Sequence, residues 1–110
     1  MDPVLRRIVD YAAGFDVSEL TGEVREAALN HVVDTVAVAI AGRYSEPAEI
    51  AGRLAGTVRA DDGATVIGMG LTSAPELAAF ANSIMVRTYD WNDGMQARGG
   101  GHPSDMVPGI

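Results

Sequence analysis

The sequence contains no cysteine and few aromatic residues, which make up 5% of its 110 residues. Without cysteine, this chain cannot form disulfides, thiolate nucleophiles, iron–sulfur clusters or zinc sites of the cysteine type. Lysine is absent too, so arginine supplies all eight basic side chains, and the 15 acidic residues bring the net charge to −7. Nucleic acid is therefore a poor partner, although the net charge does not exclude a local basic pocket for a carboxylate substrate.

Long apolar runs are also missing. No stretch reaches the roughly 18 apolar residues that a membrane span needs, and Asp10 interrupts the apolar residues that follow Arg6 and Arg7. The N-terminus thus lacks the core of a signal peptide, and we expect a soluble, cytoplasmic protein with no membrane partner. A length of 110 residues leaves room for one domain with a modest core.

Apolar residues recur at helical spacing in four stretches, which predicts a mainly α fold. The second stretch is apolar on two sides and is expected to be buried between neighbours. Ser73 and Glu76 match a capping box that would open the fourth helix. After a turn at Asp61 to Gly63, the β-branched run 64–70 predicts one short strand with no evident partner. The expected helices cover residues 2–14, 21–42, 45–58 and 73–88.

Chemistry concentrates in YDWNDGMQARGGGHPSD, residues 89–105, which follows the fourth helix. His102 can exchange a proton near neutral pH, and a neighbouring carboxylate can fix its tautomer. Pro103 biases His102 toward an extended backbone, while the glycines at 99–101 can adopt positive φ and admit a ligand close to the backbone. Acid–base chemistry on a small molecule is the natural interpretation.

Each of these features also has a purely structural interpretation. Asp90, Asn92 and Asp93 are common turn residues at a helix end, and the three glycines suit a flexible surface loop. Ser104 followed by Asp105 suits the start of another helix, with Ser104 as its cap.

Other kinds of site are disfavoured. The sequence does not favour a metal site, because only one histidine lies near the acids in the sequence. It does not favour Ser104 as a nucleophile either, because the sequence around Ser104 does not match a nucleophile elbow. His31 is expected to be a buried, hydrogen-bonded helix residue paired with Asp34, one turn away.

Several segments resemble the N-terminal part of the MmgE/PrpD family, which includes 2-methylcitrate dehydratase, cis-aconitate decarboxylase and iminodisuccinate epimerase. They are TVIGMG, SAPELAAFANSIMVRTYDWND and GGGHPSDMVPGI, and VVDTVAVAIAG is similar to an early helix of the family. The resemblance covers nearly the whole chain. It implies that residues 1–110 form the N-terminal part of a helical domain, with a second α/β domain outside this chain.

The resemblance also implies a cofactor-independent lyase that acts on small polycarboxylates. By motif it assigns proton transfer to His102, orientation of that histidine to Asp90 and shaping of the pocket to Asp93. The HPSD form favours elimination of water from 2-methylcitrate, whereas Gly94 stands where members often have threonine. No metal or cofactor is expected, and the further substrate contacts would be Asn92, Gly101, Ser104 and Asp105.

Two functions of different classes follow. The chain is either part of a dehydratase-like lyase, with decarboxylation or epimerisation as the alternative reaction, or a catalytically silent helical interaction module or fragment that needs a partner chain. Family enzymes are several times longer, and their later lysine, histidine and tyrosine have no counterpart here. We therefore expect a homodimer or association with a chain that completes the fold.

Overall fold

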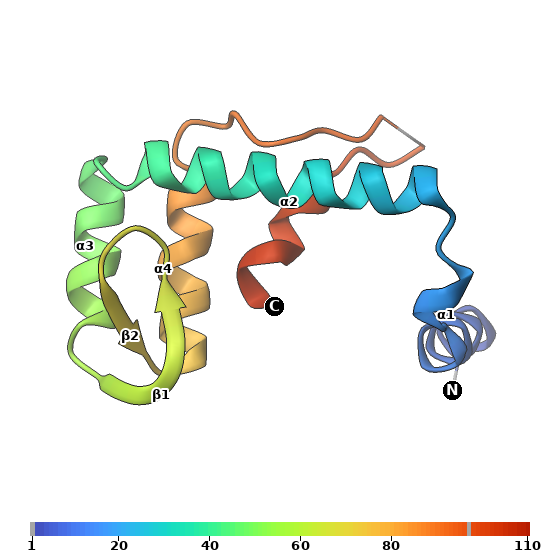
Figure 1. Cartoon of the computed structure of the whole chain (residues 1–110), viewed down its shortest axis with the longest axis horizontal. Helices are drawn as coiled ribbons and strands as arrows, with labels where there is room; N and C mark the ends of the chain where they lie inside the picture. The colour runs from blue at the N-terminus through green and yellow to red at the C-terminus, as the bar shows by residue number, and fades with distance from the viewer. Residues whose placement is uncertain (1, 97) are drawn as a thin grey trace.

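The computed structural model describes residues 2–96 and 98–110. The fold is mainly helical, as the sequence predicts, and contains one small antiparallel hairpin. In Figure 1, α2 runs along one side of the molecule, with α3, α4 and the hairpin at one end and α1 beyond the other. The elements are α1 (Pro3–Gly14), η1 (Val17–Glu19), α2 (Gly22–Gly42), α3 (Glu46–Ala55), β1 (Arg59–Val66), β2 (Leu71–Ser73), α4 (Pro75–Arg87) and η2 (Pro103–Gly109).

The first three α-helices begin at residues whose side chains cap them. Asp2 accepts hydrogen bonds from the amides of Val4 and Leu5 at 2.8 and 3.1 Å. Thr21 and Ser45 cap α2 and α3 in the same way. These oxygens satisfy amides that have no partner within the helix, which is why the helix starts could be predicted from sequence.

The hairpin differs from the single unpaired strand that the sequence predicts. β1 ends at Val66, and the residues that follow turn the chain into β2, which pairs antiparallel with β1. Gly68 and Gly70 have φ values of 69° and 64°, a conformation that glycine adopts without steric cost. Asp61 to Gly63, expected to form a separate turn, lie instead in a bulge of β1.

The capping box predicted at Ser73 and Glu76 is wrong. Ser73 is fully buried, and its hydroxyl lies 2.7 and 2.8 Å from the carbonyl oxygens of Ala55 and Val58. The N-cap of α4 is Ala74, which makes no side-chain cap. A buried hydroxyl near the carbonyl groups at the end of α3 satisfies those groups instead of the amides of α4.

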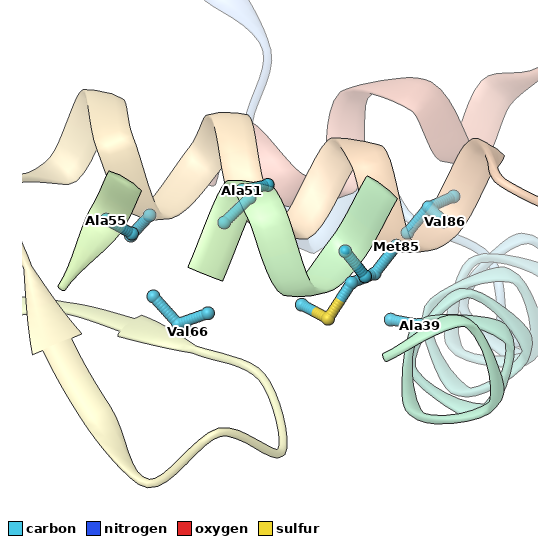
Figure 2. Packing of buried hydrophobic residues seen from close by; sticks show 9 residues of the cluster. Ala39, Ala51, Ala55, Val66, Met85 and Val86 are labelled. Carbon is cyan, nitrogen blue, oxygen red and sulfur yellow. The ribbon is translucent and has the colours of Figure 1, made fainter. Parts of the chain in front are cut away.

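The core is small and built largely from alanine. α4 lies at its centre and contacts α2, α3, β1 and η2. Figure 2 shows side chains from α2, α3, α4 and β1 packed together, with Met85 and Val66 among the largest. Alanine allows close approach of the helices, whereas the leucine and isoleucine side chains are at most partly buried against this cluster. The cluster consists of Ala39, Ala48, Ala51, Ala55, Val66, Ala78, Ala81, Met85 and Val86.

Helix α2 is buried only in its C-terminal half, so the expectation of a helix enclosed by neighbours is half met. Thr35, Val38, Ala39 and Gly42 are buried, but the apolar residues nearer its N-terminus are exposed. None of the residues of α1 is buried. None of the helices in residues 2–96 and 98–110 combines the length and hydropathy of a membrane-spanning segment.

The chain exposes more surface than a compact protein of its mass. Its accessible surface is 7791 Å², whereas a compact monomer of 11.5 kDa has about 5,800 Å². The radius of gyration is 16.0 Å, compared with about 13 Å for a compact domain of this length. Much of the excess is apolar, because the large side chains of α1 and of the first half of α2 are exposed.

We expect Gly42→Ala to destabilise the fold. A Cβ at this position would lie 2.1 Å from the backbone oxygen of Met85, so α2 and α4 would have to separate. Such overpacking typically costs about 1–3 kcal/mol. Urea unfolding measures the loss. Gly22→Ala in the same helix meets no atom within 4 Å and should be neutral or slightly stabilising; equal effects of the two changes would contradict the close contact.

Candidate acid–base site

Arg87, in the last turn of α4, anchors the loop that carries the chemistry. Its guanidinium donates to Asn92 Oδ1 at 2.8 Å and lies 3.0 Å from Asp90 Oδ1 and 3.7 Å from Asp105 Oδ1. A cation is also favourable at the C-terminus of a helix because of the helix dipole. Three acceptors on one planar group bring the start of the loop together with η2.

Asn92 and Ser104 form the buried link between the loop and η2. The Asn92 amide donates to Ser104 Oγ at 2.8 Å and to Asp105 Oδ1 at 3.2 Å. Ser104 is fully buried, and its hydroxyl donates to Asp93 Oδ1. The expectation that Ser104 caps the next helix is therefore wrong, because η2 begins after His102 and has no side-chain cap.

The Asp93 carboxylate joins η2 to α2. One oxygen, Oδ1, also accepts the Ser104 amide at 3.1 Å. The other, Oδ2, is buried and lies 2.6 Å from His31 Nδ1, although the angle is not that of an aligned hydrogen bond. His31 is thus half exposed and faces Asp93, which corrects the expected buried pairing with Asp34.

The surroundings of Asp93 favour its charged form. Burial alone raises the pKa of this carboxyl, because desolvation disfavours the charge. The hydrogen bonds from the Ser104 hydroxyl and amide, together with the charge and proton of His31, outweigh burial and hold the pKa below the ordinary value of 3.8. Near neutral pH, Asp93 is therefore an anion held between two elements.

His102 is partly buried and contacts the backbone of Asp93. Its Nδ1 lies within hydrogen-bond distance of the Asp93 carbonyl oxygen. Because a carbonyl oxygen only accepts, Nδ1 must carry a proton for this bond, and in the neutral ring Nε2 is then the basic nitrogen. The backbone of His102 has φ −120° and ψ 100°, the extended conformation that Pro103 predicts.

The remaining residues expected at the site lie differently from one another. Asp90 has a φ of 54° and pairs with Arg87, not with His102. Gly101 forms an isolated antiparallel bridge with Met95. The glycines at 99–101 do not use the positive φ that is open to them, since Gly68 and Gly70 are the glycines of the described chain that adopt it.

Two residues of this network, Arg87 and His31, were not predicted from sequence. Arg87 has a local signal, because a basic residue in the last turn of a helix with an acid three positions later predicts an ion pair. His31 has none, since its partner is 62 residues away in the sequence. Within residues 2–96 and 98–110, no three histidine, aspartate or glutamate side chains form a group that could hold a metal ion.

The chain is a helical scaffold whose loop carries an imidazole, and a buried carboxylate holds this loop to the helices. Such an arrangement is suited to acid–base chemistry. The chain belongs to the MmgE/PrpD family, whose N-terminal domain matches residues 6–110. A 2-methylcitrate dehydratase from Cupriavidus necator is 33% identical over 110 residues, covering 99% of this chain and 22% of the relative. The chain thus spans about a fifth of that relative's length. No solved structure shows a significant match to it.

Replacing Asp93 with Asn should make the fold less sensitive to acid. The lowered pKa of Asp93 adds stability that is fully present above the unfolded value of about 3.9 and is lost as pH falls through the lower folded value. Urea unfolding between about pH 6 and pH 3 should therefore show a shallower fall in unfolding free energy for Asp93→Asn than for the wild type.

Asp34→Asn is the matched control for this experiment, because it removes the same charge from the exposed surface of α2. Its pH dependence should follow that of the wild type. Identical curves for Asp93→Asn and the wild type would contradict a role of Asp93 in joining α2 to η2.

Proposed function

We propose that this domain supplies acid–base residues to a cofactor-independent lyase that eliminates water from a small hydroxy-polycarboxylate, with 2-methylcitrate as the favoured substrate. The observation that carries the proposal is the contact of His102 Nδ1 with the Asp93 carbonyl, which leaves Nε2 as the basic nitrogen. Family membership and the name of the C. necator relative support the substrate class. We place the reaction in the cytoplasm.

Elimination of water from a hydroxy acid needs two proton transfers. A base removes a proton from the carbon beside a carboxylate, and an acid delivers a proton to the departing hydroxyl. His102 performs one of these transfers through Nε2. Asp93 holds the ring through its backbone carbonyl, and its charged carboxylate secures that part of the loop to α2 and η2.

The other candidate residues divide into two groups in this proposal. The polar atoms of Asn92 and Ser104 are already bonded within the protein, so these residues hold the loop in place and do not contact the substrate. Asp90, Asp105 and Gly101 are exposed and remain candidates for substrate contact. A Cβ added at Gly94 would meet no neighbouring atom within 4 Å, so there is open space at the position where family members often carry threonine.

Decarboxylation and epimerisation also begin from a small polycarboxylate, and no contact in the described chain favours either over elimination. The silent interaction module differs in kind, because it would need no imidazole with a basic nitrogen. The exposed apolar surface is expected both for one part of a lyase and for a silent interaction module, so it does not distinguish the two functions. The reaction test must therefore rest on His102.

A graft tests the proposed reaction. Residues 6–110 would replace the matching segment of the C. necator dehydratase, and formation of unsaturated acid from 2-methylcitrate would be followed by absorbance. His102→Gln should lower kcat by about 10²–10⁴-fold, the range for loss of one acid–base group. Circular dichroism checks that the fold is kept. A graft variant that turns over at the unsubstituted rate would contradict the assignment, and Asn30→Ala is an exposed control.

We also propose that further protein covers the apolar surfaces of α1 and α2, either a second copy or a chain that completes the fold. Contiguous apolar patches beyond a few hundred Å² mark interaction sites in soluble proteins, and this chain exposes about a third more surface than a compact monomer. Light scattering of the isolated chain should show association that increases with concentration. A monodisperse monomer throughout would contradict this proposal.

A further inference from the structure

We infer that His31 is a positioning residue for His102, acting through Asp93; this inference rests on the proposed role of His102. His31 belongs to α2, and no contact joins the two imidazoles directly. Each nevertheless contacts Asp93: His31 faces the carboxylate at 2.6 Å, and His102 faces the backbone carbonyl. One residue of the loop therefore connects them.

The environment of Asp93 Oδ2 explains why His31 matters. This oxygen is buried and receives no aligned hydrogen bond, so the proton on His31 Nδ1 is its nearest compensation. A buried carboxylate oxygen with no partner at all is costly. If His31 is removed, Oδ2 is better hydrated when the loop at Asp93 moves toward solvent, and a movement of the whole residue also displaces the backbone carbonyl that His102 contacts.

Movement of that carbonyl would change the tautomer of His102. The Asp93 carbonyl stabilises the ring form with the proton on Nδ1. Without a correctly placed acceptor, the proton is free to move to Nε2, and Nε2 then no longer accepts a proton. His31 thus maintains a reactive form of His102 without contacting the substrate.

Ser104 provides the competing structural explanation. Its amide and hydroxyl both bind Asp93 Oδ1, and this pair of bonds holds the carboxylate from the other side. If Ser104 alone fixes Asp93, changes at His31 will leave His102 as it is. The inference therefore makes a claim that can fail while the fold and the Ser104 contacts remain intact.

The test is nitrogen NMR of the histidine side chains in the 110-residue chain, recorded at a pH where the spectrum itself shows the neutral ring of His102. Wild-type His102 should show a proton on Nδ1. His31→Ala should lower the ratio of the Nδ1–H to the Nε2–H form by about fivefold, the factor that one net hydrogen bond supplies. His31→Asn should restore most of the ratio, because its amide nitrogen occupies the position of Nδ1.

Asn30→Ala, a neighbouring exposed change in α2, is the control and should give the wild-type ratio. In the dehydratase graft, His31→Ala should lower kcat by up to about fivefold with little change in KM, because the reactive tautomer of His102 is depleted by no more than that factor, and His31→Asn should recover most of it. A His102 tautomer ratio that is unchanged in His31→Ala overturns the inference, and so does a failure of His31→Asn to restore it.

The NMR measurement needs no turnover, so the two proposals fail separately. If the ratio responds to His31 but His102→Gln stays active, the positioning contact exists and the proposed function is wrong. If His102→Gln is inactive but His31→Ala leaves the tautomer unchanged, the proposed function stands and the positioning role is wrong.

Discussion

The site depends on the contacts that the Asp93 carboxylate makes with α2 and η2. This carboxylate lies on the loop between α4 and η2, faces His31 of α2 through one oxygen and accepts two hydrogen bonds from Ser104 of η2 through the other. A buried charge is stable only when such partners surround it. The loop, η2 and the middle of α2 are thereby fixed to one another, and the backbone of the same residue orients His102.

That arrangement in turn requires α2 and α4 to be close. At Gly42, α2 approaches the backbone of Met85 so closely that no side chain fits between the helices. Small alanine side chains make up most of the core in which α4 packs against its other neighbours (Figure 2). α4 ends at Arg87, whose guanidinium contacts acceptors at both ends of the loop. Close helix packing thus determines where the loop begins and which turn of α2 it reaches.

The contrast between the two ends of the molecule is physically informative. Around α4 the polar groups of the loop are bonded within the chain, whereas α1 and the first half of α2 expose apolar side chains. An isolated helix of 12 residues is marginal in water, and none of the residues of α1 is buried in this chain. A polar site beside an uncovered apolar surface fits a domain that works within a larger assembly, as we propose.

The sequence by itself determined the four α-helices, the starts of the first three and the extended backbone before Pro103, because these depend on neighbouring residues. It also identified the loop of residues 89–105, since acids, histidine and glycine cluster there. It failed for Ser73, Ser104 and His31, whose partners lie outside their own segments. Their hydrogen bonds and ion pairs were decided by tertiary structure, because a buried polar group takes whichever partner packing brings within reach.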